Sequence, residues 1–169
     1  IPDECKQEII SAQEKLKKVP GLRAKFVEPR NFHLTLRFLD EISESQIRKI
    51  KELLPKIKLK PFKAHFGRVG VFPSTSYVRV IWISLEPSEE AKRLARKINE
   101  LLGIEDENFK SHVTLARVRD VANKKALGKA LEGIMPEEKE FEVKEFKLKK
   151  STLSPGGPMY GDIYTFPLK

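Results

Sequence analysis

A His-x-Thr-Leu tetrapeptide occurs twice in this chain, as His33-Leu34-Thr35-Leu36 and as His112-Val113-Thr114-Leu115. The chain has only three histidines, and two of them stand in this same short sequence. An imidazole can accept or donate a proton near neutral pH, and a neighbouring hydroxyl can donate a hydrogen bond to an anionic oxygen. The repeated pair predicts one site with two matching arms.

Strand periodicity supports this interpretation, because side chains of a strand point alternately to its two faces. Apolar and polar residues alternate around the first motif, with Phe32, Leu34, Leu36 and Phe38 set against His33, Thr35 and Arg37. In the second motif, Val113 and Leu115 alternate with the histidine and the threonine. Each motif should present an imidazole and a hydroxyl on the face away from the core. Two structural histidines beside solvent-facing threonines are the alternative, which the duplication disfavours.

The duplication extends beyond the motifs. The separation from His33 to Phe62 is 29 residues, and so is the separation from His112 to Phe141. We expect helices at 3–18, 43–58, 88–102 and 122–133, and strands at 31–39, 62–71, 77–85, 109–118 and 139–149. No strand precedes the first helix, so the repeat predicts a further strand before Ile1.

The domain organisation follows from these elements. We predict a single α+β domain over residues 1–169, because no linker or low-complexity tract interrupts the chain. It should have two lobes, lobe 1 over about 1–72 plus the C-terminal strands and lobe 2 over about 77–150. The stretch Pro155-Gly156-Gly157-Pro158 predicts a tight turn that joins two C-terminal strands.

Local signals support the individual elements. Ser43 and Gln46 have the spacing of a capping box, and Pro55 is expected to end or kink the same helix. Apolar stripes at helical spacing mark the first and third helices: Cys5, Ile9, Ala12 and Leu16, then Ala91, Leu94, Ile98 and Leu101. The run from Tyr77 to Leu85 is rich in β-branched residues, and its Trp82 is expected in the core.

Composition limits the classes of function. Thirty-three Lys and Arg against 24 Asp and Glu give a net charge of +9, which suits a polyanionic partner. A charged thermophilic surface would explain the density of charge but not its positive excess. The single Cys5 excludes a disulfide framework and favours the cytoplasm. No apolar run is long enough to span a membrane.

Two histidines and two hydroxyls match few kinds of chemistry. Two histidines without a cysteine or a paired carboxylate are too few ligands for zinc, and no serine or cysteine nucleophile stands with a base and an orienting acid. One imidazole that takes a proton from a nucleophile and one that donates to a leaving oxygen suit displacement at phosphorus. Hydroxyl donors can hold the other phosphate oxygens. The pattern predicts metal-free phosphodiester chemistry on an activated ester such as a cyclic phosphate.

These residues carry a family resemblance over essentially the whole chain. The paired motifs, the segment from Asn31 to Leu39, the segment from His112 to Arg117 and the C-terminal segment from Lys150 to Tyr160 resemble the 2H phosphoesterase superfamily. Within it, the chain looks most like the LigT-like RNA 2′,3′-cyclic phosphodiesterases, also called 2′-5′ RNA ligases. Members usually begin with a short strand just before the Ile-Pro that opens this sequence.

The resemblance implies two lobes related by a pseudo-twofold axis, with antiparallel sheets lining a central groove, helices outside, and the motif strands facing each other across the groove. It implies hydrolysis of an RNA-terminal 2′,3′-cyclic phosphate to a 2′-phosphomonoester, with a weak reverse 2′-5′ ligation. By motif order, His33 would be the proton donor and His112 the proton acceptor. We expect no cofactor and no metal, a monomer, and RNA ends such as tRNA halves as the partner.

Three further residues are candidates for substrate binding besides Thr35 and Thr114. Arg37 shares the polar face of its motif. Arg117 has the opposite parity from His112, with Ala116 in the place beside the threonine, so its role rests on the resemblance unless a bulge turns the strand. Tyr160 could stack on a base.

The remaining aromatic and imidazole side chains have weaker signals. Tyr77 is also a candidate for stacking on a base, whereas Phe109 fits core packing better. His65 lacks a threonine partner, which indicates a surface or structural residue.

A binding module for nucleotides or RNA ends is the rival hypothesis, in which the same groove holds phosphate without turnover. Keeping both histidines and both threonines favours catalysis, because binding alone would tolerate Arg or Lys in one arm. A general RNA-binding sheet would need more exposed aromatic residues than 8% of the chain supplies.

Overall fold

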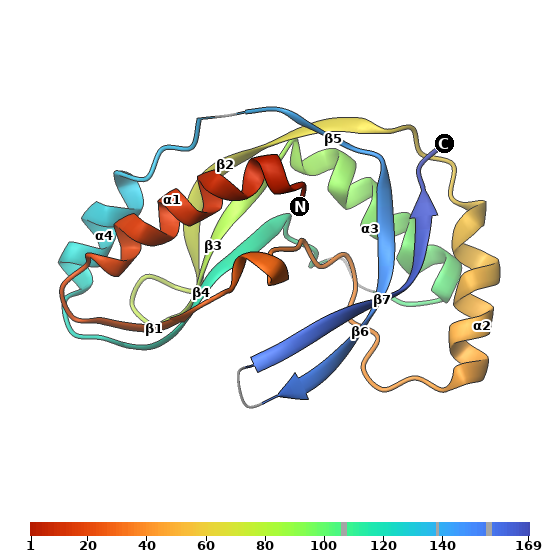
Figure 1. The fold of residues 1–169 in the computed structure, drawn as a ribbon, viewed down its shortest axis with the longest axis horizontal. Helices are drawn as coiled ribbons and strands as arrows, with labels where there is room; N and C mark the ends of the chain where they lie inside the picture. Colours follow the sequence, from red (N-terminus) through yellow and green to blue (C-terminus); the bar gives the residue numbers. More distant parts are fainter. Residues whose placement is uncertain (106–107, 138, 155–156) are drawn as a thin grey trace. The chain divides into compact units, whose positions relative to one another are not determined.

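The chain combines helices with antiparallel strands in a computed structural model that describes residues 1–105, 108–137, 139–154 and 157–169. The α-helices in these residues are α1 (Lys6–Lys17), α2 (Glu44–Leu53), α3 (Ser88–Leu102) and α4 (Lys124–Glu132). The strands are β1 (Leu22–Phe26), β2 (Phe62–Pro73), β3 (Val78–Glu86), β4 (His112–Val121), β5 (Phe141–Val143), β6 (Glu145–Ser154) and β7 (Gly157–Pro167) (Figure 1). The predicted α+β class is confirmed.

The strands form two sheets. The larger has the order β1-β4-β3-β2-β5, and the smaller is the hairpin β6-β7. The pairs β1–β4, β2–β3, β3–β4 and β6–β7 are antiparallel, as expected. None of the helices in the described residues is both long enough and apolar enough to cross a membrane.

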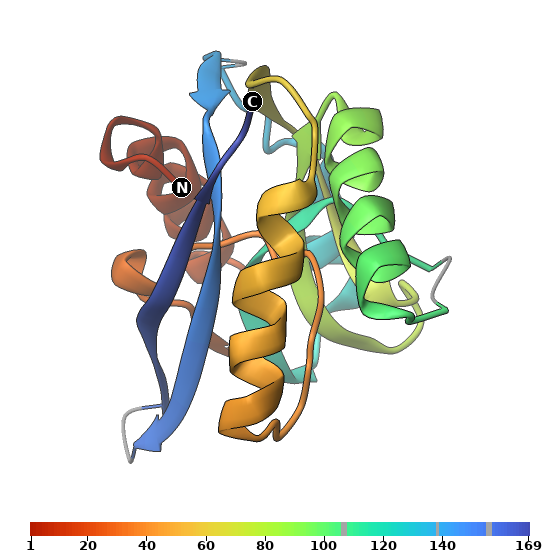
Figure 2. The same ribbon diagram turned by 90° about the vertical axis from the view of Figure 1, so that its right-hand side faces the viewer.

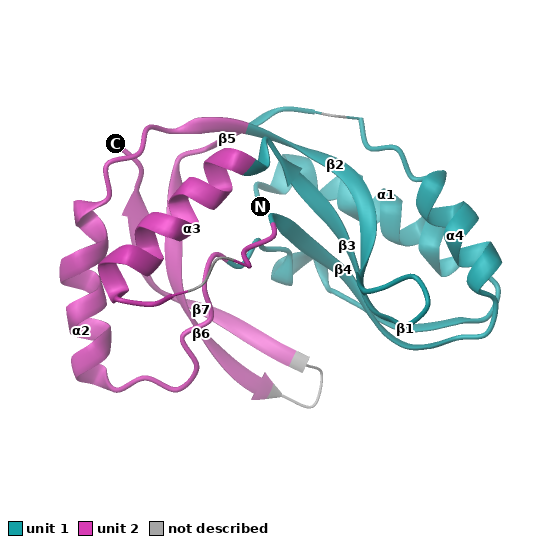
Figure 3. Ribbon diagram, turned by 180° about the vertical axis from the view of Figure 1, so that it is seen from behind, with its two compact units in different colours: residues 1–35, 64–88, 111–141 teal, residues 36–63, 89–110, 142–169 magenta. Residues whose placement is uncertain are grey.

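Contacts divide the chain into two compact units (Figure 3). Unit 1 contains residues 1–35, 64–88 and 111–141, and unit 2 contains residues 36–63, 89–110 and 142–169. Each unit draws segments from both halves of the sequence, so the units cut across the two expected lobes. The cause is strand pairing: β4, from the second half, lies between β1 and β3 in one sheet.

The core of unit 1 is built on one face of this sheet. The predicted stripe of the first helix is buried, because Cys5, Ile9, Ala12 and Leu16 are at most 3% exposed. Helix α1 contacts β1, β4 and α4. The sheet contributes its own fully buried side chains, namely Ile81, Ile83, Val113 and Leu115. The side chains that alternate with these residues must therefore point to the opposite face of the sheet.

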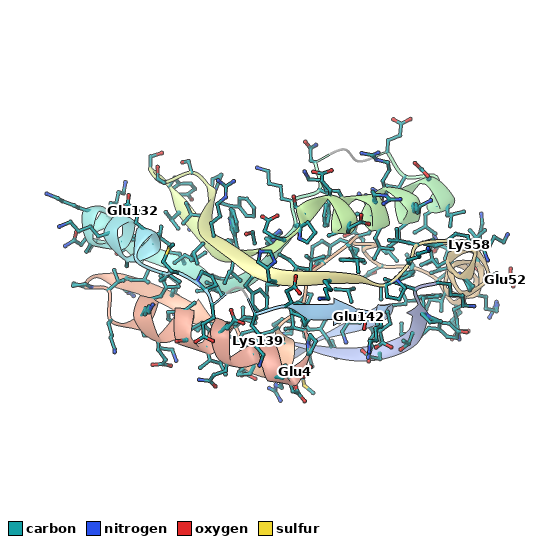
Figure 4. The ribbon with its side chains drawn as sticks, turned by 90° about the horizontal axis from the view of Figure 1, so that it is seen from above. Glu4, Glu52, Lys58, Glu132, Lys139 and Glu142 are labelled. Carbon is teal, nitrogen blue, oxygen red and sulfur yellow. The ribbon has the colours of Figure 1, made fainter. Side chains whose placement is uncertain are left out.

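Unit 2 has a separate apolar core. Ile50 and Leu54 of the α2 region pack with Phe146 of β6 and Phe166 of β7, so the hairpin lies along α2 (Figure 2). Helix α3 adds Leu94 and Ile98, as its stripe predicts. The outward side is charged: Glu52 and Lys58 point away from α2 and the segment after it (Figure 4).

The termini of α2 follow the local signals. The Ser43 hydroxyl accepts a hydrogen bond from the Gln46 backbone N–H, and the Gln46 side chain accepts one from the Ser43 backbone N–H. This reciprocal capping box confirms the prediction. The α-helix ends at Leu53, and a 3-10 turn containing Pro55 follows, because proline cannot continue the hydrogen-bond ladder.

Several expected elements differ from the structure. β1 was not predicted, although Leu22, Ala24 and Phe26 alternate along it. The expected strand 31–39 is not regular; a 3-10 turn at Pro29–Asn31 interrupts the chain, and Phe38 is 67% exposed rather than on an apolar face. The strand expected at 139–149 is divided into β5 and β6. The predicted turn at 155–158 falls partly outside the described residues.

Candidate active site

Both His-x-Thr motifs lie in unit 1 and run antiparallel to each other. Leu34, at the centre of the first motif, forms a β-bridge with Val113, at the centre of the second. In antiparallel pairing, the residues flanking a bridged pair lie crosswise. The histidine of each motif therefore lies across from the threonine of the other.

The four polar side chains share a face and are accessible to a ligand. His33, Thr35, His112 and Thr114 are all partly exposed. Opposite Cβ atoms are typically about 4.5–5.5 Å apart, and residues two apart on a strand about 7 Å. At such spacings the four polar side chains form one cluster on this face. The motifs are neighbours within one unit, whereas the repeat assigned them to different lobes.

One hydrogen bond fixes the tautomer and orientation of the His33 imidazole. The Nδ1 atom lies 2.6 Å from the carbonyl oxygen of Asn31. A carbonyl can only accept, so Nδ1 carries a proton and donates it to this bond. Nε2 is therefore the ring nitrogen that points away from this carbonyl. The 3-10 turn that ends at Asn31 supplies this carbonyl, so the interruption of the strand orients the imidazole.

His112 stands in an aromatic cluster on the opposite face from the core. Its ring meets the Phe72 ring edge-on at 5.1 Å between centroids and the Trp82 ring at 6.2 Å. Phe72 and Trp82 also contact each other at 5.0 Å. Trp82 is therefore not in the core, which corrects the prediction. Gly70 makes room for the indole, since a Cβ atom at that position would overlap the ring.

A β-bulge lies at the last residue of the second motif. Ile81 lies opposite Ala116 and Trp82 lies opposite Thr114, so Leu115 has no partner on β3. Leu115 and Ala116 are both fully buried, whereas strict alternation would expose one of them. Strict alternation predicted that Ala116 lies on the polar face beside the threonine. The bulge turns it to the buried face instead.

The bulge also reverses the parity of Arg117. This residue lies opposite Val80, which shares its side of β3 with Trp82, and Trp82 lies opposite Thr114. Directly opposite residues of an antiparallel pair point to the same face. Arg117 is exposed and thus joins the face that carries the second motif.

A buried glutamine holds the bulge in place. Gln13 of α1 is 3% exposed, and its side-chain N–H groups donate to the carbonyl of Val27 at 2.8 Å and to the carbonyl of Leu115 at 2.9 Å. The Val27 backbone N–H donates to the same Leu115 carbonyl at 2.9 Å. Gln13 therefore ties the core-side helix to the point where β1 gives way to the first motif.

Two of the predicted substrate-binding residues lie in unit 2. Arg37 is half-buried in the irregular segment after the first motif, and Tyr160 is half-buried in β7, opposite Ser151. Their roles stay predictions. Tyr77 is 60% exposed and lies 5.6 Å from the Arg79 guanidinium, whereas Phe109 is half-buried.

The third histidine has a different setting. His65 lies on β2 opposite Glu86, with no threonine beside it. Within the described residues, no group of three or more His, Cys, Asp and Glu side chains could hold a metal ion. The two motif histidines, unlike His65, lie beside the hydroxyls of the motif threonines.

Sequence reasoning missed four residues that shape this site. Gln13, Phe72 and Trp82 position the motif strands or the imidazole, and Lys25 lies opposite Arg117 on the same face. Alternation along 22–26 could have revealed β1 and its outward Lys25. The other three depend on contacts between distant segments.

The chain is similar to known proteins of one family over most of its length. The family model described as LigT like Phosphoesterase matches residues 1–82 and again residues 83–160, in agreement with the internal repeat. An RNA 2′,3′-cyclic phosphodiesterase of Archaeoglobus fulgidus is 35% identical, with 98% of this chain and 95% of the relative covered. One of Methanocaldococcus jannaschii is 36% identical, with 95% and 92% covered.

Solved structures of similar proteins share this fold. A crystal structure from Thermus thermophilus superposes with a TM-score of 0.79 at 30% identity, covering 99% of this chain and 93% of that one. The apo crystal structure of E. coli LigT gives a TM-score of 0.78 at 23% identity, covering 99% and 92%.

Proposed function

Because the chain belongs to the LigT-like phosphoesterase family and is therefore an enzyme, we propose that it hydrolyses RNA-terminal 2′,3′-cyclic phosphate to a 2′-phosphomonoester. The bridge between Leu34 and Val113 carries this proposal, since it brings both His-Thr pairs to one face of unit 1. The names of the curated relatives support the choice of substrate.

The two imidazoles take opposite roles in the reaction. His112 accepts a proton from water as the water oxygen attacks phosphorus, and the imidazolium of His33 donates its Nε2 proton to the departing 3′ oxygen. The bond from phosphorus to that oxygen breaks, and the phosphate remains on the 2′ oxygen. The Asn31 carbonyl holds Nδ1 of His33, so the donating nitrogen points away from the backbone.

The threonines stabilise the charge that develops on phosphorus. The hydroxyls of Thr35 and Thr114 donate hydrogen bonds to the two non-bridging oxygens, and Arg117 adds positive charge on the same face. In this mechanism the two histidines transfer the protons, the threonines and Arg117 stabilise the charge, and no step needs a metal. Metal independence is therefore part of the proposal.

The partner is RNA that ends in a cyclic phosphate, and tRNA halves are one source of such ends. Ligation would follow the same steps with the 5′-hydroxyl of a second RNA in place of water: its oxygen attacks the cyclic phosphate, the 3′ oxygen leaves, and a 2′-5′ bond forms. A positive net charge of +9 favours this class of polyanion.

The test is turnover of a nucleoside 2′,3′-cyclic phosphate in the presence of EDTA. His33→Ala and His112→Ala should each lower kcat by about 10²–10⁴-fold. His65→Ala is the matched control, because this histidine is outside the motifs, and it should keep the wild-type rate. Binding without turnover would instead support a non-catalytic module, and loss of activity in EDTA would refute metal independence.

The product decides the assignment of the two roles. Chromatography against 2′- and 3′-monophosphate standards should show the 2′-phosphate. A predominant 3′-phosphate would exchange the acid and the base while leaving a mechanism with two histidines.

A further inference from the structure

Unit 2 contains an open basic pocket with a volume of about 490 Å³. Its lining includes four cationic side chains, those of Lys58, Lys60, Arg93 and Lys169, and one acidic side chain, that of Glu90. Among the residues that the structure describes, none of the motif histidines and threonines lines this pocket, so it is separate from the candidate active site. Its volume is within the range of about 300–1,000 Å³ that is usual for ligand sites.

The segment that carries Lys58 and Lys60 is extended and anchored in the core of unit 2. Ile57 has extended backbone angles, and burial alternates after it. Ile57 and Leu59 are 4% and 5% exposed, whereas the two lysines are exposed. The Lys169 backbone N–H donates to the Leu59 carbonyl at 2.8 Å. Because side chains of an extended chain alternate in direction, both lysines point to the outer side of the segment.

The protein leaves part of the positive charge in this pocket uncompensated. The Glu90 carboxylate accepts hydrogen bonds from the Arg93 guanidinium at 3.1 and 3.2 Å, so these two charges offset each other. Several exposed lysines elsewhere in the structure also pair with nearby carboxylates. Within the described residues, neither Lys58 nor Lys60 forms an ion pair. Two neighbouring cations without carboxylate partners favour an anionic ligand.

The spacing of the two lysines fits the backbone of a nucleic acid. Residues two apart on an extended chain are roughly 7 Å apart. Neighbouring phosphates of an RNA strand have a comparable separation, because a ribose lies between them. The phosphates of a nucleoside triphosphate are closer together, because they share a bridging oxygen. The lining also includes Pro61 and the half-buried Phe62, and proteins that bind single strands combine a positive groove with aromatic side chains.

We infer that this pocket binds two successive phosphates of a single RNA strand through Lys58 and Lys60. The inference rests on the proposed function for the class of ligand, and it adds a contact with RNA outside the two motifs. A nucleoside 2′,3′-cyclic phosphate has only one phosphate, so it cannot contact both lysines in this way.

The test measures binding of a fluorescent single-stranded oligouridylate that ends in a 3′-hydroxyl, so no turnover is needed. The double variant Lys58→Gln/Lys60→Gln should weaken binding at low salt by about tenfold. The slope of log affinity against log salt should become less steep by about 1.4, because two phosphate contacts of about 0.7 each are lost. Lys58→Arg/Lys60→Arg should keep both values, since it retains the charges.

Lys49→Gln/Lys56→Gln is the matched control, because it removes two exposed lysines of unit 2 that do not line the pocket. This variant should keep the wild-type affinity and salt slope. An unchanged affinity in Lys58→Gln/Lys60→Gln would overturn the inference. An equal loss in both double variants would overturn it as well, because RNA would then respond to net charge alone.

Titration with ATP is the second arm of the test. A loss of ATP affinity in Lys58→Gln/Lys60→Gln, with RNA affinity unchanged, would assign the pocket to a free polyphosphate and overturn the assignment to RNA. Turnover of a nucleoside 2′,3′-cyclic phosphate tests the proposed function separately. Failure of that reaction would refute the proposed function, whereas the binding of RNA by the pocket is measured whether or not turnover occurs.

Discussion

Replacing Gln13 with Met tests whether the buried amide holds the β-bulge beside the second motif. The substitution removes the two hydrogen bonds to the carbonyls of Val27 and Leu115. Each bond contributes about 0.5–1.5 kcal/mol net, and a buried acceptor that loses its donor costs more. Methionine keeps a similar volume, so the cavity term is small. We expect the free energy of unfolding to fall by about 2–3 kcal/mol.

Urea denaturation measures this change, with Gln7→Met as the control. Gln7 is on the same helix but is exposed, so its substitution should stay within about 0.5 kcal/mol of wild type. For a chain of this size, the expected loss in Gln13→Met corresponds to a fall in Tm of about 4–12 °C. The slope of the urea transition should not change, because the surface exposed on unfolding is the same.

The same variant should also lose activity while it is fully folded. The bulge determines where Thr114 and Arg117 lie, and a shift of about 1 Å at a reacting group can lower the rate by about 10²-fold. We expect kcat to fall about tenfold at a temperature well below the transition. A loss of stability below about 0.5 kcal/mol would refute the structural role of Gln13, and unchanged kcat in a destabilised variant would refute its link to the site.

Three other perturbations follow from the site and the core. Thr35→Val and Thr114→Val should each cost about 2.7 kcal/mol of transition-state stabilisation with little change in urea stability; unchanged kinetics would make that hydroxyl structural. Gly70→Ala should displace Trp82, the only tryptophan, so both its fluorescence emission and kcat should change, and an unchanged spectrum would contradict the contact. Burial raises the pKa of the Glu8 carboxyl, so the folded chain holds that proton to higher pH than the unfolded chain, and stability falls as pH rises through this range. Glu8→Gln should therefore stabilise the chain at neutral pH but not in acid below the usual glutamate range, as denaturation at both pH values would show.

The second motif shows what local pattern predicts well. Val113 and Leu115 are fully buried and their polar neighbours are accessible, as alternation indicated. The capping box of α2 and the buried stripe of α1 were also predictable, because each depends on spacing within one element. The first motif was harder, since a 3-10 turn and a single bridge replace a regular strand.

The sequence by itself determined which side chains could do the chemistry: two histidines, two threonines and the face on which the second pair lies. Only the tertiary structure decided that Leu34 bridges Val113, that a bulge brings Arg117 to the same face, and that Lys25 lies opposite it. The physical reason is that periodicity records the environment of each face along one strand. Which strand becomes the neighbour, and where an extra residue interrupts the pairing, depends on hydrogen bonds between segments far apart in the chain.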